Sequence, residues 1–210
     1  MSKIENTRVY NLEEAIKTAK YPKAVNIDSL TTDLTDGIKA LGQVPTGTGH
    51  DNYLKGIVVC FDLTFSNKAW VEAERYHFLD FVSSQSTMHK INKFDIKSQC
   101  NRYVDERNIM VLQEKVNEYN RLLKLPTEGL SKEVLKSRKE AIDEAFLSVI
   151  YNIPSGFELT AGMVTNYQQL KTIYQQRRNH RLKDWQVFCD WCETLPMFME
   201  LTQKEKTNEE

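Results

Sequence analysis

The stretch of residues 165–178 constrains this chain more than any other, because it reads as one helix without proline or glycine. Its spacings of i, i+4, i+7 and i+11 place four residues on a single helical stripe: Asn166, Leu170, Ile173 and Arg177. The apolar middle of the stripe can be buried, whereas its ends carry an amide and a guanidinium. A buried guanidinium needs an anionic partner, because an unpaired buried charge is very costly. That partner is either a protein carboxylate or a bound anion.

The rest of the chain is rich in helical patterns and poor in strand patterns. Strands are expected at residues 56–65, 78–82 and 157–161, and the longest helix over residues 95–124. The apolar side chains expected on the buried side of that helix are Ile96, Cys100, Tyr103, Met110 and Val111. We therefore predict an α+β fold: a helix-rich single domain over residues 1–202, with a small, mainly antiparallel sheet and long helices. Residues 203–210 are all polar and are expected to form a disordered tail.

Charge and composition exclude several classes of protein. The 28 basic and 29 acidic residues nearly cancel, which argues against a nucleic-acid partner. No apolar run approaches a membrane span, and the N-terminus lacks the apolar core of a signal peptide. We therefore expect a cytoplasmic protein with reduced thiols and without a membrane partner.

Two cysteines, Cys189 and Cys192, form a lone C-x-x-C pattern. A structural zinc site needs further ligands at set spacing, and a redox motif needs a βαβ context. Neither surrounds this pair, so we interpret both cysteines as part of a helical core and predict no metal site.

Polar side chains gather in residues 83–90, SSQSTMHK. They either satisfy backbone groups at the end of a strand, or form an anion cradle in which Ser84, Ser86 and main-chain N–H groups bind phosphate oxygens. A second polar run follows the stripe helix. Compensation of the helix dipole explains its Arg178, Arg181 and Lys183. It does not explain Arg177, which shares a stripe with apolar residues.

Several segments together resemble one family in their order and spacing. They are residues 49–54 (GHDNYL), 75–77 (RYH), 84–89 (SQSTMH) and 152–154 (NIP), followed by Asn166 and Arg177. This arrangement is similar to the flavin-dependent thymidylate synthases, the complementing type that works without a catalytic cysteine. The closest likeness is to a divergent phage-type branch that carries S-T-M-H-K and R-R-N-H-R. A phage origin would place the protein in the host cytoplasm.

The resemblance implies a homotetramer that binds FAD, dUMP, methylenetetrahydrofolate and NADPH in sites shared between subunits. It implies catalytic roles for Arg177 and Ser86, with Arg177 beside the uracil carbonyl. The same two residues would bind substrate together with Ser84 and Gln85, which lie near the dUMP phosphate. The cofactor-binding residues that it implies are His50, Arg75, His77 and Asn166.

The chain departs from the family pattern at several cationic positions. The family signature is R-H-R, seven residues, then S, whereas here Arg75-Tyr76-His77 and eight residues precede Ser86. Further positions where the family carries an acid, a histidine or an arginine are occupied by Lys55, Gly56, Ile150 and Gln168. Each arginine-to-phosphate contact contributes on the order of 1.5–3 kcal/mol, so three such losses are enough to abolish binding of the family ligands.

Three functional hypotheses remain open. The chain is a flavin-dependent methyltransferase acting on a pyrimidine nucleotide, or a non-catalytic phage protein that binds or sequesters a nucleotide on the same scaffold. The third hypothesis is a structural or interaction protein in which a carboxylate, Asp80 or Asp184, pairs with Arg177. The partner of the Arg177 guanidinium separates the third hypothesis from the other two.

Overall fold

The computed structural model describes residues 2–204, which form two compact units. The first, called the sheet unit, comprises residues 2–63, 71–83 and 161–204. The second, called the helical unit, comprises residues 64–70 and 84–160. The single domain over residues 1–202 stays a prediction. Of the expected tail, residues 205–210 lie outside the described residues.

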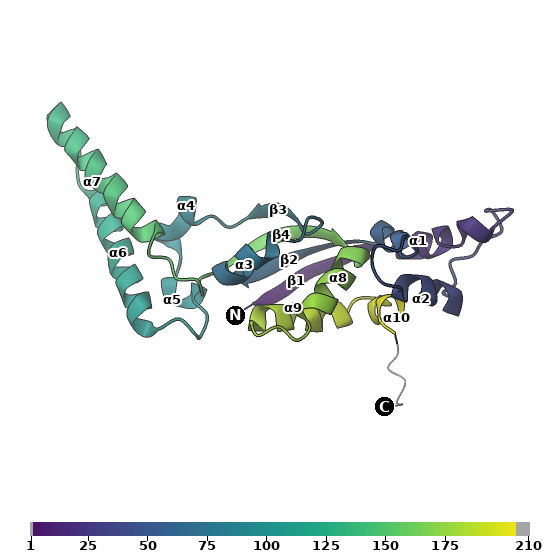
Figure 1. Ribbon diagram of the computed structural model, residues 1–210. Helices are drawn as coiled ribbons and strands as arrows, with labels where there is room; N and C mark the ends of the chain where they lie inside the picture. The colour runs from purple at the N-terminus through teal and green to yellow at the C-terminus, as the bar shows by residue number, and fades with distance from the viewer. Residues whose placement is uncertain (1, 205–210) are drawn as a thin grey trace. The chain divides into compact units, whose positions relative to one another are not determined.

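Four strands form one sheet, in the spatial order β1-β2-β4-β3 (Figure 1). Its strands are β1 (Lys3–Tyr10), β2 (Val58–Ser66), β3 (Asp80–Ser84) and β4 (Glu158–Asn166). Asn67 N–H bonds to Phe157 O beyond one end of β2, and Tyr167 N–H bonds to Ile57 O at the other, so β2 and β4 are antiparallel. The predicted α+β class with a small antiparallel sheet and long helices is confirmed. The sequence patterns did not predict β1.

The core of the sheet unit lies between β2 and two helices, α8 (Tyr167–Arg177) and α9 (Lys183–Glu193). Alternate β2 side chains, Val59, Phe61 and Leu63, are buried, as expected for a strand covered on one face. The Phe61 ring lies 6.2 Å from the ring of Phe188 on α9. In Figure 1, α8 and α9 lie together along one side of the sheet.

The shorter elements of the sheet unit surround this core. They are α1 (Leu12–Thr18), η1 (Tyr21–Lys23), α2 (Asp36–Gln43), η2 (Asn52–Gly56) and α10 (Phe198–Thr202). Phe198 of α10 joins α10 to α8, because its ring lies 5.3 Å from that of Tyr167 and 5.9 Å from that of Tyr174. None of the helices formed by residues 2–204 has the length and apolar character to cross a membrane.

The helical unit is built around a pair of long helices, α6 (Glu106–Lys124) and α7 (Lys132–Ile150). These helices lie side by side in Figure 1 and contact each other along their length. The short elements α4 (Thr87–Lys90), η3 (Ile91–Lys93) and α5 (Ile96–Gln99) precede them. The buried core of this unit consists of Ile91, Ile96, Leu112, Val116, Val149 and Phe157. Helix α3 (Asn67–Ala73) begins in the helical unit and ends in the sheet unit.

The single helix predicted over residues 95–124 is wrong, because the chain leaves the helical conformation between α5 and α6. Cys100 forms an isolated antiparallel bridge with Phe157, and the Asp105 side chain then caps α6 by accepting from Arg107 N–H. The break changes the helical phase. Leu112 and Val116 therefore face the core, whereas the side chains expected there are exposed: Tyr103, Met110 and Val111.

A fully buried ion pair ties the sheet unit together. The Lys171 ammonium on α8 donates to Asp51 Oδ2 at 2.9 Å, to Gly42 O at 2.7 Å and to Val44 O. Both side chains are 0% exposed. Asp51 Oδ1 accepts from Gln168 Nε2 at 2.9 Å. One ammonium therefore ties both ends of the loop 44–51 to α8.

Replacing Lys171 by Met should destabilise the protein by about 3–5 kcal/mol, because it leaves the Asp51 carboxylate buried without its cation. Adding Asp51→Asn to that variant should recover part of the loss, because the buried charge is then removed. Urea unfolding followed by tryptophan fluorescence measures both effects. The exposed Lys183→Met is the matched control and should change stability by no more than about 0.5 kcal/mol. A loss below about 1 kcal/mol for Lys171→Met would show that the fold does not depend on this ion pair.

Candidate functional site

Helix α8 begins at an amide and ends at a guanidinium, as its sequence pattern predicts. Asn166 is the N-cap, and its Oδ1 accepts from Gln169 N–H at 2.9 Å. Leu170 and Ile173 are 0% exposed and Arg177 is 7% exposed. The predicted stripe is therefore confirmed, with the guanidinium itself drawn into the protein.

Arg177 is ion-paired with Glu72 of α3. Its Nη1 donates to Glu72 Oε2 at 3.1 Å, and both side chains are nearly buried. The same carboxylate oxygen accepts from Trp185 Nε1 at 3.1 Å and lies 3.4 Å from His180 Nε2. Together with Tyr76, these residues form what we call the Arg177 cluster: Glu72, Tyr76, Arg177, His180 and Trp185.

Two aromatic side chains hold the plane of the guanidinium. Arg177 Nε donates to Tyr76 Oη at 2.7 Å, and Tyr76 Oη in turn donates to Gln176 Oε1 at 3.0 Å. The Arg177 Cζ atom lies 4.9 Å from the centre of the Trp185 ring and 5.6 Å from that of Tyr76, within the range of cation–π attraction. The orientation of the guanidinium is thus set by the hydrogen bonds of its nitrogens and by the aromatic rings of Tyr76 and Trp185.

The carboxylates predicted as partners of Arg177, Asp80 and Asp184, are wrong. Asp80 is exposed at the start of β3, and Asp184 accepts a hydrogen bond from Ser2 Oγ at 2.8 Å. Sequence reasoning missed Glu72. Glu72 lies in the last turn of α3, whereas Tyr76 lies three residues beyond the end of this helix, so no helical spacing related the two side chains in the sequence. The buried residues of α3 include Ala69 and Ala73, at 0% and 6% exposure.

The predicted cofactor-binding residues of the sheet unit lie at its surface, apart from Asn166. Arg75 and His77 are exposed on either side of the buried Tyr76, without hydrogen bonds or ion pairs to residues 2–204. His50 is exposed next to Asp51, whose side chain links that turn to α8. The side chains of Arg75, His77 and His50 therefore face solvent, while their neighbours in sequence, Tyr76 and Asp51, are buried.

The predicted phosphate-binding residues, Ser84, Gln85 and Ser86, belong to the helical unit. Gln85 is used structurally: its backbone N–H donates to Thr160 O at 2.9 Å, and its Oε1 accepts from Thr160 N–H at 3.0 Å. Ser86 precedes α4 without capping it by its side chain, and Ser84 is exposed at the end of β3. Gln85 therefore satisfies a backbone group at the strand end, whereas the hydroxyls of Ser84 and Ser86 form no hydrogen bond to residues 2–204.

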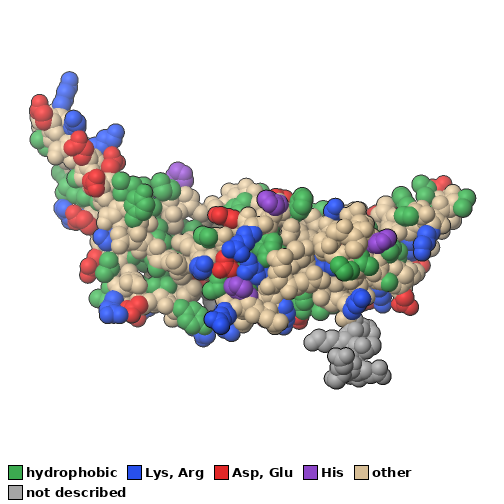
Figure 2. Space-filling model, viewed as in Figure 1, with side chains coloured by type: hydrophobic (Ala, Val, Ile, Leu, Met, Phe, Trp, Pro, Cys, Tyr) green, Lys and Arg blue, Asp and Glu red, His purple; other side chains and the backbone are tan. Residues whose placement is uncertain are grey.

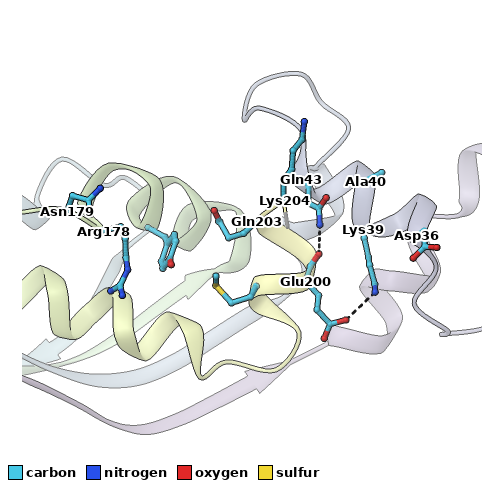
Figure 3. Close-up of a pocket in the computed structure, with 11 residues that line it drawn as sticks. Asp36, Lys39, Ala40, Gln43, Arg178, Asn179, Glu200, Gln203 and Lys204 are labelled. Carbon is cyan, nitrogen blue, oxygen red and sulfur yellow. Dashed lines mark hydrogen bonds and ion pairs between the residues drawn. The ribbon is translucent and has the colours of Figure 1, made fainter. Parts of the chain in front are cut away.

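A separate pocket of about 860 Å³ lies between α2, the end of α8 and α10 (Figure 3). Opposite charges compensate each other in its wall: Lys39 pairs with Glu200 at 3.4 Å, and Arg178 pairs with Asp190 and Glu193. None of the predicted site residues lines it. On the face shown in Figure 2, basic, acidic and histidine side chains likewise alternate rather than form one basic patch.

The two cysteines of the C-x-x-C pattern are both 0% exposed on α9, so the prediction of core cysteines is confirmed. Burial raises the pKa of the Cys189 thiol to about 11 and that of Cys192 well above its usual value. In the described part of the chain, no group of three or more His, Cys, Asp or Glu side chains is placed to hold a metal ion.

Comparison with solved structures identifies the fold. Flavin-dependent thymidylate synthase ThyX from Helicobacter pylori, complexed with FAD and dUMP, matches with a TM-score of 0.57 and 15% identity, over 94% of this chain and 96% of that chain. A second structure of the Helicobacter pylori enzyme gives a TM-score of 0.59 at 14% identity, over 95% and 96%. The chain has the ThyX fold.

A third similar structure is the UMP/dUMP methylase PolB from Streptomyces cacaoi, bound with 5-Br dUMP. Its TM-score is 0.58 at 14% identity, over 96% of this chain and 92% of that chain. No known family profile matches the sequence, and no curated protein matches it. The ThyX fold is thus evident from the backbone rather than from sequence similarity.

In this ThyX fold, replacing Arg177 by Ala should lower the free energy of unfolding by about 3–5 kcal/mol, because Glu72 is left nearly buried without its cation. Urea titration measures the loss. Arg181→Ala, an exposed arginine four residues on, is the control and should change stability by about 0.5 kcal/mol or less. Equal stabilities of the two variants would show that the Glu72–Arg177 pair contributes nothing to the fold.

Cys189 and Cys192 should resist alkylation by iodoacetamide at pH 8, because the reactive form is the thiolate and burial disfavours it. A pKa of about 11 leaves roughly one Cys189 thiol in a thousand ionised at pH 8. Peptide mass spectrometry of native protein measures the modification, and protein unfolded in urea provides the control. Modification of Cys189 at the same rate in both samples would contradict its burial.

Proposed function

We propose that this protein is a flavin-dependent thymidylate synthase-like enzyme that binds a pyrimidine nucleotide and methylates dUMP or carries out a related pyrimidine modification. The observation that carries the proposal is the ThyX fold of the chain. The pairing of Arg177 with Glu72 by itself fits the structural hypothesis, so a role in ligand binding is left to the guanidinium nitrogen that Glu72 and Tyr76 do not use. The neighbouring structures hold dUMP or 5-Br dUMP, which supports a pyrimidine nucleotide as ligand. The sequence resemblance adds Arg177 and Asn166 at matching positions.

The exposed side chains of the sheet unit fit the chemistry of a flavin dinucleotide. Arg75 and His77 are donors without protein partners among residues 2–204, which suits the diphosphate of FAD. His50 is a third exposed donor, on a turn held firmly at Asp51. Asn166 commits its Oδ1 to the helix cap, so its Nδ2 remains as the group that can donate to a ligand. A bound flavin would supply the redox chemistry, with methylenetetrahydrofolate and NADPH as co-substrates.

Arg177 would act on the pyrimidine by orientation and charge. Its guanidinium donates to a ring carbonyl and stabilises the negative charge that develops on that oxygen as the ring reacts. Because hydrogen bonds and rings already fix the guanidinium, little reorganisation accompanies the reaction. No enzyme nucleophile is required, in agreement with the burial of Cys189 and Cys192.

The remaining roles follow from the resemblance and stay part of the proposal. Ser84, Gln85 and Ser86 would hold the nucleotide phosphate, with Ser86 as a catalytic group. The active form would be a homotetramer in the cytoplasm, encoded by a phage. The non-catalytic alternative keeps the same ligand, and it is supported by the departures from the family signature at Tyr76 and His77.

Purified protein incubated with FAD should retain the visible absorbance of flavin after desalting, and dUMP should raise its melting temperature. A nucleotide at 100 times its dissociation constant stabilises the folded state by about 2.7 kcal/mol. Turnover of dUMP with methylenetetrahydrofolate and a reductant then separates the enzyme from the binding protein. ATP serves as the control nucleotide and should have no effect on the melting temperature.

Two outcomes divide the hypotheses. Stabilisation by dUMP without turnover would favour the non-catalytic nucleotide-binding protein. A colourless protein that ignores both FAD and a panel of pyrimidine nucleotides would overturn both ligand-binding hypotheses and leave the Arg177 cluster as a structural feature.

A further inference from the structure

The Arg177 guanidinium already donates hydrogen bonds to other side chains of the protein, which limits the ligands that it can bind. Nε donates to Tyr76 Oη at 2.7 Å and Nη1 donates to Glu72 Oε2 at 3.1 Å. The rings of Tyr76 and Trp185 lie within 6 Å of Cζ. Two of the three nitrogens are therefore satisfied internally.

The third nitrogen, Nη2, is the one that can meet a ligand. It makes no hydrogen bond to any residue from 2 to 204, and no buried side-chain nitrogen or oxygen among these residues lacks a partner. Nη2 therefore reaches the surface, although Arg177 as a whole is only 7% exposed. The two N–H groups of Nη2 are therefore the donors that the Arg177 cluster can offer to a ligand.

The charge behind these donors is neutralised. The Glu72 carboxylate pairs with Nη1 and offsets the charge of the guanidinium, so a phosphate at Nη2 would meet repulsion from the carboxylate as well as attraction from the guanidinium. A neutral carbonyl oxygen accepts from N–H donors without that repulsion. Like charges placed together are a common means of rejecting the wrong ligand.

We propose that Glu72 is a specificity-determining residue: it makes the exposed edge of Arg177 select a neutral carbonyl, as on a uracil ring, and reject phosphate. This inference rests on the proposed function, because it assigns the base rather than the phosphate of the nucleotide to Arg177. Glu72 acts through Arg177 and through its hold on Trp185 and His180, without touching the reacting atoms.

The test compares Glu72→Gln with the unaltered protein, using deoxyuridine and inorganic phosphate as separate probes in calorimetric titrations of the full chain. Glutamine keeps the shape and an oxygen acceptor for Arg177 and Trp185 but removes the charge. Affinity for phosphate should rise by about tenfold or more, and this gain should weaken with added salt. Affinity for deoxyuridine should change much less.

Two further variants keep the inference falsifiable. Glu72→Asp retains the charge and should still reject phosphate. Glu74→Gln removes an exposed charge two residues away and should leave both affinities unchanged. If Glu72→Gln does not fold, the aspartate variant still decides, because a gain of phosphate binding there would overturn a role of charge.

The outcomes separate this inference from the proposed function. If deoxyuridine binds and Glu72→Gln gains no phosphate affinity, the role of Glu72 is overturned while the nucleotide-binding proposal stands. If deoxyuridine and dUMP do not bind the unaltered protein, the proposed function is overturned, and assignment of a base to Arg177 is overturned with it.

Discussion

Two cations buried on one helix determine how the sheet unit is held together. Lys171 and Arg177 both lie on α8, and each would be too costly to bury without a carboxylate. Asp51 and Glu72 supply those carboxylates from segments more than 100 residues earlier in the chain. Pairing at both points favours the register of α8 in which its apolar side chains lie against the sheet. The apolar core supplies most of the driving force, and the two ion pairs specify the arrangement.

The two pairs differ in how many of the cation's N–H donors the protein itself satisfies. Lys171 satisfies all three of its N–H donors within the protein and is 0% exposed, so it can only hold the loop 44–51 in place. Arg177 leaves one nitrogen at the surface. Glu72 is shared among Arg177, Trp185 and His180, which connects α3 with both helices that cover the sheet. A ligand at Arg177 would thus contact a position fixed from three elements.

The part of the site that depends on local spacing could be predicted from the sequence, and the part that depends on tertiary pairing could not. The helical period predicted one stripe with Asn166, Leu170, Ile173 and Arg177. The core position of Cys189 and Cys192 was predicted because no further zinc ligands occur near them in the sequence. The identity of the carboxylate was different: any acidic residue could have paired with Arg177, and only the packing of α3 selects Glu72. Lys171 escaped notice because it lies on a second buried stripe, with Tyr167 and Tyr174 at spacings of four and three residues. The prediction of one long helix over residues 95–124 was wrong because the β-bridge between Cys100 and Phe157 overrides the local helical preference.

The departure from the family signature at residue 76 can be understood from the same contacts. The resemblance places a histidine at this position, where the chain has Tyr76. Its phenol oxygen accepts from Arg177 Nε and donates to Gln176, and its ring lies edge-on, 5.8 Å from that of Trp185. A phenol is larger than an imidazole, and its oxygen can donate one hydrogen bond while it accepts another. Tyr76 therefore helps to fix the guanidinium, while the flanking Arg75 and His77 are exposed. The tyrosine at this position is thus used inside the protein, where its oxygen orients Arg177 and its ring packs against Trp185.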